Sequence, residues 1–310
     1  MGTSQAYFKG QFMPTADAKM GIMTHAFHYG TAVFEGIRGN WNEQRGEIYL
    51  FRAKEHFERL RRSCKIMQIT LPHSDDELVR MATRMVGTSE YKEDIYVRPL
   101  AYKSSEALGV RLHNLEDDFL MFCIPFGPYL DLTKGIHCCT STWRRVADNG
   151  IPARAKVTGI YANGALAKTE ANLNGFEEAI MLSDDGHVSE GSGENLFMVV
   201  DGKLITPPPQ DNILVGITRA SIIQLAEDEL GLETVERSID RTELYIADEV
   251  FLTGTAAHVT AVARLDHREI GNGGIGEITA KLQEIYFAMV KGEVPKYRDW
   301  LTPIYAGVTA

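Results

Sequence analysis

The chain has 310 residues, of which 44% are apolar and 24% charged, and its formal net charge is −10. This is the composition of an ordinary soluble globular protein, and the length is sufficient for two domains with a sizeable core. The acidic balance excludes nucleic acid as the main partner, because neutralising phosphates requires a basic patch. Anionic ligands would therefore have to meet local arginines.

Neither the cysteines nor the apolar runs point outside the cytoplasm. The four cysteines include no Cys-x-x-Cys pair, and we expect free thiols in a reducing compartment. The most apolar run, residues 119–130, is too short to span a bilayer and contains two prolines. No charged and then apolar signal sequence opens the chain. We expect a cytoplasmic protein with no membrane partner and no metal site.

Hydrophobic periodicity in the first part of the chain predicts alternating strands and helices. The expected elements are a hairpin at residues 6–13, a strand at 47–52, helices at 53–67 and from the capping box of Ser74 and Glu77, and strands at 94–103 and 118–125. Tyr96 and Arg98 lie two apart and so share one face of their strand. Pro99 allows the alternative of an edge strand at that place.

Turn residues at 126–135 indicate a linker. We therefore divide the chain into a small N-terminal domain (residues 1–126), a linker (127–136) and a larger C-terminal domain (137–310). The elements expected after the linker are a strand at 136–143, a helix at 165–174, hairpins turning at Asp185-Gly186 and Asp201-Gly202, a helix from about 214 to Gly231, a strand at 249–257 and a helix at 278–289.

Residues 151–197 hold the candidates for covalent chemistry. A lysine amine forms a Schiff base only when it is neutral, and burial or a neighbouring cation lowers its pKa from about 10.4. Lys156 has small or apolar neighbours, whereas Lys168 lies in a helix-forming run and is predicted to face solvent. Glu190 ends a short predicted strand before glycines that allow close backbone approach. A surface lysine and an ordinary acidic loop are the alternatives from the residues alone.

The sequence Glu190-Gly-Ser-Gly-Glu-Asn195-Leu-Phe197 resembles the signature of the fold type IV, class IV aminotransferases. Ala155-Lys156, with Tyr161 five residues after the lysine, resembles the cofactor-lysine segment of that family. From about Tyr7 to about Trp300 the chain is similar to the branched-chain amino acid aminotransferases. The resemblance implies an α/β fold of two domains, the second a pseudo-barrel, with pyridoxal 5'-phosphate as cofactor and a homodimer or dimer-based homo-oligomer as the assembly.

The resemblance also implies a role for each matched residue. Lys156 would carry the cofactor, and Glu190 would keep its ring nitrogen protonated. The other implied cofactor contacts are Arg59, Tyr161, Ile217, Thr218 and Thr255. The implied substrate contacts are Tyr29, Phe34, Gly36, Tyr96, Arg98, Tyr129, Ala256 and Ala257. By pattern alone Arg59 belongs to a solvated basic edge of its helix. Arg98 would pair with the side-chain carboxylate of glutamate or 2-oxoglutarate.

Two positions depart from the family pattern. Relatives often carry Gly-Gly-Asn-Tyr after the lysine, and here Thr158-Gly159-Ile160-Tyr161 keeps only the tyrosine in place. Phe126 stands where tryptophan is expected, which leaves the preference among aliphatic side chains open. The predicted activity is reversible amino transfer between L-leucine, L-isoleucine or L-valine and 2-oxoglutarate. The alternatives are a D-amino acid or (R)-amine transaminase or an aminodeoxychorismate lyase of the same fold, or a non-catalytic protein that keeps only the fold.

Overall fold

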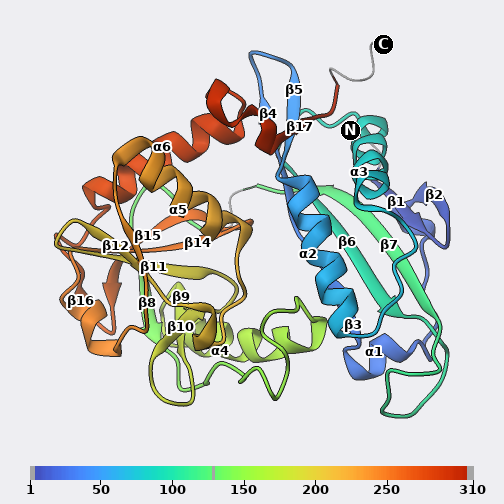
Figure 1. The fold of residues 1–310 in the computed structure, drawn as a ribbon, viewed down its shortest axis with the longest axis horizontal. Coiled ribbons are helices and arrows are strands. Elements are labelled where there is room, and N and C mark those ends of the chain that lie inside the picture. Colours follow the sequence, from blue (N-terminus) through green and yellow to red (C-terminus); the bar gives the residue numbers. More distant parts are fainter. Residues whose placement is uncertain (1–3, 128–129, 306–310) are drawn as a thin grey trace. The chain divides into compact units, whose positions relative to one another are not determined.

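The computed structural model describes residues 4–127 and 130–305 (Figure 1). These residues form two compact units. The first contains residues 4–127, 155–159 and 288–305, and the second contains residues 130–154 and 160–287. Both units combine a sheet with helices, so the predicted mixed α/β class is confirmed. The division at a linker of residues 127–136 stays a prediction, because the chain returns to the first unit twice after that point.

An antiparallel sheet forms the first unit. Its strands follow the order β17-β5-β4-β6-β7-β1-β2, with β3 paired to β6. The strands are β1 (Gln5–Phe8), β2 (Gln11–Pro14), β3 (Ala32–Phe34), β4 (Ile37–Asn42), β5 (Glu47–Phe51), β6 (Ile95–Lys103), β7 (Asp117–Pro125) and β17 (Leu301–Pro303), and the helices are α1 (His25–Tyr29), α2 (Ala53–Ile66) and α3 (Asp75–Ser89). Helix α3 contacts β1 and β7, and α2 contacts α3 and β3.

Local signals in the first unit produce the predicted elements. Lys9 and Gly10, both with positive φ, turn the β1–β2 hairpin. Ser74 and Glu77 form the predicted capping box at the start of α3. Strand β6 is not an edge strand, so that alternative is wrong: it pairs with β7 along its whole length, and with β3 and β4 on its other side. Pro99, which has no N–H to donate, lies between the residues that pair with β3 (100–102) and those that pair with β4 (95–97), where the ladder on that side is interrupted. Its carbonyl accepts a hydrogen bond from Glu35 N–H at 2.9 Å.

A mixed sheet forms the second unit, in the order β10-β9-β8-β15-β14-β11-β12-β13, with β16 paired to β15. Its strands are β8 (Ile136–Thr140), β9 (Glu178–Leu182), β10 (Val188–Gly191), β11 (Asn195–Val200), β12 (Lys203–Thr206), β13 (Thr234–Glu236), β14 (Glu249–Gly254), β15 (His258–Leu265) and β16 (Arg268–Glu269). The helices that follow the linker are α4 (Tyr161–Leu173), α5 (Ile217–Leu230) and α6 (Glu277–Val290). Apolar side chains of the strands, such as Ile180, Leu196 and Leu252, form its core.

Both predicted hairpins of the second unit are present, and Gly231 ends α5 with φ +63° as expected. Several boundaries differ. Strand β8 ends at Thr140 rather than at residue 143, and α4 begins at Tyr161 rather than at 165. Helix α5 begins at Ile217 rather than at about 214, and β14 ends at Gly254 rather than at 257. Gly164 is buried in α4, where its missing side chain allows close contact with the Ser192 carbonyl.

None of the helices in the described part of the chain combines the length and the apolarity that crossing a bilayer requires.

Candidate active site

Lys156 is held in the first unit through its backbone. Its carbonyl accepts a hydrogen bond from Phe34 N–H at 3.0 Å, and its N–H donates to Ser63 Oγ at 3.2 Å. Val157 forms an isolated antiparallel bridge with Val33. The Lys156 Nζ atom lies 5.0 Å from the centroid of the Phe34 ring. The amine is therefore placed over an aromatic face.

The segment after the lysine packs directly on the loop after α1. Gly30 has φ +63°, and a Cβ atom built on it would lie 2.8 Å from the Cα atom of Gly159. The Thr158 hydroxyl donates to the Gly30 carbonyl at 3.0 Å. Glycine is therefore needed at position 30 both for its backbone conformation and for this close approach.

A buried acid, Glu35, follows Phe34 and pairs with Arg59. Arg59 donates from Nε to Oε1 at 2.7 Å and from Nη2 to Oε2 at 2.8 Å, and His56 Nδ1 lies 2.7 Å from the same Oε2. All three residues are buried. The prediction of a solvated edge for Arg59 is therefore wrong, because a long-range partner draws its guanidinium inside. Sequence reasoning did not single out Glu35 or His56, although an acid within an apolar segment was the available signal.

The charge states of this trio follow from its contacts. Burial alone would raise the pKa of Glu35, but the charge and hydrogen bonds of Arg59, with those of His56, hold it well below its usual range. Burial lowers the pKa of His56, and nearby Arg59 and Lys156 lower it further against the pull of Glu35. An ionised Glu35 can only accept, so a neutral His56 donates from Nδ1.

Tyr96 and Arg98 come together as the shared strand face predicts, and Phe34 lies beside Arg98. Arg98 donates from Nη2 to the Tyr96 hydroxyl at 3.1 Å, and its Cζ atom lies 4.5 Å from the Phe34 ring centroid. The Tyr96 hydroxyl lies where a Cβ atom of residue 36 would be, so Gly36 is required for this packing. The buried Nε atom of Arg98 has no hydrogen-bond partner within residues 4–127 and 130–305. The site therefore contains an arginine with unused donor capacity.

Tyr29 lies at the end of α1 and is partly exposed. Its hydroxyl accepts a hydrogen bond from Gly109 N–H at 3.0 Å, which ties α1 to the loop between β6 and β7. Its ring lies 4.6 Å from that of buried His25. The predicted substrate contact Tyr129 lies outside the described residues.

In the second unit Glu190 lies within β10, at an irregularity where two residues of β10 face one of β9. Its buried carboxylate pairs with Arg145 Nη2 at 2.8 Å through Oε1. Oε2 accepts from Asn195 Nδ2 at 3.0 Å and from Leu214 N–H at 3.1 Å. Arg145 was not identified from the sequence, because no local pattern links it to a residue 45 positions later. The contacts favour a fixed, ionised carboxylate.

The start of α5 is tied to this acid. Asn195 Nδ2 also donates to the Leu214 carbonyl at 2.8 Å, and Gly216, the N-cap residue, packs against the Asn195 side chain. The first turn of α5 contains Ile217 and Thr218, both buried, and begins without a side-chain cap. Free N–H groups and the positive end of the helix dipole make such a turn an anion site.

The remaining predicted contacts lie at chain turns of the second unit. Thr255, Ala256 and Ala257 form the turn between β14 and β15, and the Ala257 carbonyl accepts from Thr260 Oγ1 at 2.6 Å. Ala257 is buried, whereas Thr255 and Ala256 are partly exposed. Tyr161 is the first residue of α4 and is half-buried.

Lys168, the rival lysine, does not face solvent. Its Nζ atom lies 2.5 Å from Glu178 Oε2 and donates to the Glu177 carbonyl at 2.7 Å. The prediction fails because β9 runs under the end of α4 and offers a buried acid to the lysine. Lys168 is thereby committed to an ion pair, whereas Lys156 lies over an aromatic ring.

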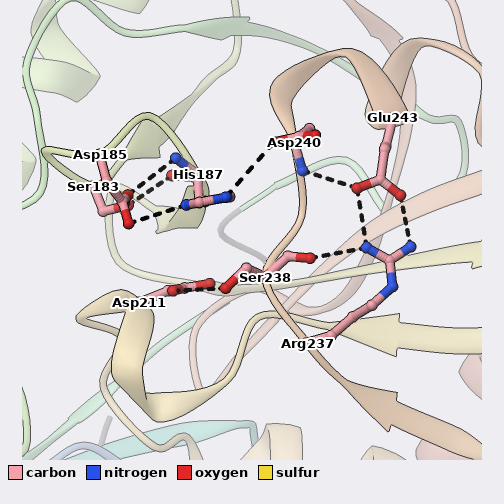
Figure 2. Close-up of polar contacts among 8 residues, drawn as sticks. All are labelled: Ser183, Asp185, His187, Asp211, Arg237, Ser238, Asp240 and Glu243. Carbon is pink, nitrogen blue, oxygen red and sulfur yellow. Dashed lines mark hydrogen bonds and ion pairs between the residues drawn. The ribbon is translucent and has the colours of Figure 1, made fainter.

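The turn that leads to Glu190 is anchored by polar contacts (Figure 2). His187 lies with Nδ1 3.0 Å from Asp185 and Nε2 3.7 Å from Asp240. The Asp185 carboxylate, in contact with the imidazole as an acceptor, raises the pKa of His187, which favours the ion pairs. His187 is three residues before Glu190, so these contacts hold the strand that presents the acid.

Comparisons with known proteins agree with one another. Residues 32–265 match the family model described as amino-transferase class IV. A protein of Aquifex aeolicus (strain VF5), named a probable branched-chain-amino-acid aminotransferase, is 50% identical over 300 residues, which cover 97% of this chain and 96% of that protein.

Solved structures are similar over the whole fold. The branched-chain aminotransferase from Thermoproteus uzoniensis, solved with norvaline, is 42% identical with a TM-score of 0.93 and covers 98% of this chain and 100% of its own. The branched-chain amino acid aminotransferase from Thermobaculum terrenum, solved in its PLP-form, is 37% identical with a TM-score of 0.93, and the match covers 98% of this chain and 99% of that chain.

Proposed function

Because the chain belongs to the class IV aminotransferase family, and within it to the branched-chain-amino-acid aminotransferases, we propose that it transfers an amino group reversibly between L-leucine, L-isoleucine or L-valine and 2-oxoglutarate, with pyridoxal 5'-phosphate as cofactor. The family membership confirms the resemblance found in the sequence.

The position of the Phe34 ring supports the proposed range of substrates. Lys156 Nζ lies 5.0 Å and Arg98 Cζ 4.5 Å from the centroid of this one ring. A pocket wall of this kind offers an apolar face to an aliphatic side chain and a guanidinium to the distal carboxylate of glutamate or 2-oxoglutarate. The unused donor capacity of Arg98 supports that role. This arrangement is the main observation in favour of a pocket that accepts both an aliphatic amino acid and glutamate or 2-oxoglutarate.

The residues present fit the cofactor. The donor set contains a lysine amine for the aldehyde, a buried carboxylate for the ring nitrogen, and donors for a phosphate. The proposed phosphate contacts are Arg59, Ile217, Thr218 and Thr255, and Tyr161 is proposed for the phenolic oxygen. When bound, the cofactor supplies an electron sink for the substrate's Cα carbanion.

Each protein group then has a definite task. Lys156, once neutral, takes the proton from the Cα atom of the amino donor in the first half of the reaction. In the second half it delivers a proton to the Cα atom of the amino acid that is formed from the acceptor. Glu190, kept ionised by Arg145, holds the ring nitrogen protonated. Tyr96, with the turn of Ala256 and Ala257, is proposed to orient the α-carboxylate. Phe34 excludes water from the amine, and Tyr29, Gly36 and Tyr129 complete the proposed pocket.

A second copy of this chain in the cytoplasm is the proposed macromolecular partner. The segment around α1 and the loop between β6 and β7 expose apolar side chains, namely Met20, Ile22, Met23, Phe27, Leu108 and Val110. Hydrogen bonds between the two segments, such as that from Gly109 to Tyr29, make them one continuous patch. Exposed patches of this kind mark protein interfaces, and we propose that it is covered in a homodimer.

An absorbance titration tests the function. The purified protein is expected to show the visible band of a bound aldehyde cofactor and to lose it on addition of L-leucine. Lys156→Ala should lack this band, whereas Lys168→Ala should keep it if it folds. Activity with D-alanine but not with L-leucine would refute the proposed substrates, and an unchanged band in Lys156→Ala would refute the assignment of the lysine.

A further inference from the structure

The buried trio of Glu35, His56 and Arg59 carries an inference that deepens the proposed function and rests on it. We propose that Glu35, supported by His56, is the positioning residue of Arg59: it fixes the plane of the guanidinium so that this cation meets the phosphate of the cofactor in one orientation. Arg59 is the binding group, and Glu35 acts only through it.

Glu35 holds Arg59 by two bonds rather than one. The Nε–Oε1 and Nη2–Oε2 distances of 2.7 and 2.8 Å define a bidentate pair, which sets both the position and the plane of the guanidinium. His56 holds the same carboxylate from another side, at 2.7 Å from Oε2. A glutamine at position 35 would present one oxygen and one NH₂ group, so it could not accept both arginine bonds.

Stability alone does not explain the charges at this place. Glu35 is fully buried and Arg59 nearly so. Replacing a buried ion pair with apolar side chains of similar volume is often neutral or stabilising, because removing two charges from water costs as much as their attraction returns. A guanidinium held in a fixed plane is, in contrast, what bidentate recognition of a phosphate requires.

The backbone around Glu35 is fixed on both sides. The N–H of Phe34 donates to the Lys156 carbonyl at 3.0 Å, and the N–H of Glu35 itself donates to the Pro99 carbonyl at 2.9 Å. Gly36 packs against the Tyr96 hydroxyl. The carboxylate is therefore anchored to the same segment that holds the cofactor lysine, and it relates the orientation of Arg59 to the position of that lysine.

Affinities for pyridoxal 5'-phosphate and for pyridoxal, the same aldehyde without its phosphate, test the proposal. Dissociation constants of both compounds are measured on the cofactor-free protein by equilibrium dialysis. The dissociation constant of pyridoxal divided by that of pyridoxal 5'-phosphate reports the contribution of the phosphate. We expect Glu35→Gln to reduce this ratio about tenfold and to change the affinity for pyridoxal by less than about twofold.

Two controls make the test specific. In an Arg59→Met background, Glu35→Gln should leave the ratio unchanged, because the two residues act through one contact. Glu47→Gln should keep the wild-type ratio. Glu47 is another buried acid of the first unit, and its Oε1 atom accepts from the N–H groups of Ile304 and Tyr305. His56→Asn should reduce the ratio by a smaller factor, and it replaces Glu35→Gln if that variant does not fold.

The outcomes separate this proposal from the proposed function. An unchanged ratio in Glu35→Gln, or in His56→Asn where Glu35→Gln does not fold, overturns the positioning role and leaves the transaminase function intact. The same loss in Glu47→Gln, or a further loss in the Arg59→Met background, also overturns it. A wild-type protein that binds neither compound overturns the proposed function instead.

Discussion

Two buried carboxylates, Glu35 in the first unit and Glu194 in the second, differ in their charge near neutral pH. Arg59 and His56 surround Glu35 with donors and hold its pKa well below the usual range against the effect of burial. The Glu194 carboxylate accepts from the N–H of Gly193 at 3.0 Å. Burial, with the nearby charge of Glu178, raises the pKa of Glu194 to about 8.

The comparison teaches that partners rather than depth decide whether a buried acid is ionised. Glu190 belongs with Glu35 in this respect, since Arg145 meets one of its oxygens and two N–H donors meet the other. Each of these two acids is thus supplied with a cation by the fold. Glu194, four residues after Glu190, feels Lys168 only as a lesser influence than burial and Glu178, and it is kept protonated up to weakly basic pH.

Removing the Arg59 guanidinium that pairs with Glu35 is expected to have the largest effect on stability. Arg59→Met leaves an ionised carboxylate buried with His56 alone, and we expect the free energy of unfolding of the cofactor-free protein to fall by about 3–5 kcal/mol in urea titrations. The folded pKa of Glu35 lies below its unfolded value. Its stabilising contribution is therefore present above the unfolded pKa and is lost as the pH falls toward the folded one.

Arg61→Met on the same helix is the control for that variant. Arg61 is partly exposed, pairs with Asp75 at 2.9 Å and also donates to the Leu71 and His73 carbonyls, and its loss should cost less than about 2 kcal/mol. Equal losses of unfolding free energy in Arg59→Met and Arg61→Met would show that the buried pair stabilises the fold no more than the Arg61 pair does.

Removing Arg145 sharpens the comparison between Glu35 and Glu190. Glu190 keeps the donors of Asn195 and Leu214 after Arg145→Met, so we expect a smaller loss of about 2–3 kcal/mol in the same urea titration. A loss larger than that of Arg59→Met would contradict the view that each added donor offsets part of the cost of burying the charge.

Glu194→Gln is expected to have the smallest effect and the opposite sign. The raised folded pKa means that Glu194 destabilises the protein increasingly as the pH rises from its unfolded value, with the full penalty above about 8. The glutamine variant should be more stable than wild type by about 1–2 kcal/mol at pH 9, and the difference should vanish near pH 5. Thermal unfolding at both pH values measures this difference. If the variant and wild type differed in stability by the same amount at both pH values, Glu194 would not be the group that titrates in this range.

Local signals predicted much of the fold and long-range pairs escaped prediction. The capping box of Ser74, the turn at Lys9-Gly10 and the glycine end of α5 depend on residues close in sequence, and all three are present. The partner of Arg59, Glu35, lies between β3 and β4, and the partner of Lys168, Glu178, lies in β9. No periodicity reveals either pairing, so the sequence pattern wrongly placed both cations toward solvent.

The candidate site shows the same division. The shared face of Tyr96 and Arg98 follows from strand geometry and is observed. The contacts of Glu35 and of Arg145 with the predicted site residues needed the structure, because each joins segments more than 20 residues apart. The roles of the individual residues toward cofactor and substrate stay predictions that the variants above address.

The way the chain returns to the first unit has a consequence for its synthesis. Strand β5 pairs with β17 at residues 301–303, and Val33 pairs with Val157. A ribosome that has produced only residues 1–127 has therefore released neither the outer strand of this sheet nor the segment that carries the lysine. Completion of the first unit must wait until residues 301–303 have been synthesised, and such distant pairings are slow to form. The nascent N-terminal part is thus the stretch for which a chaperone would matter most.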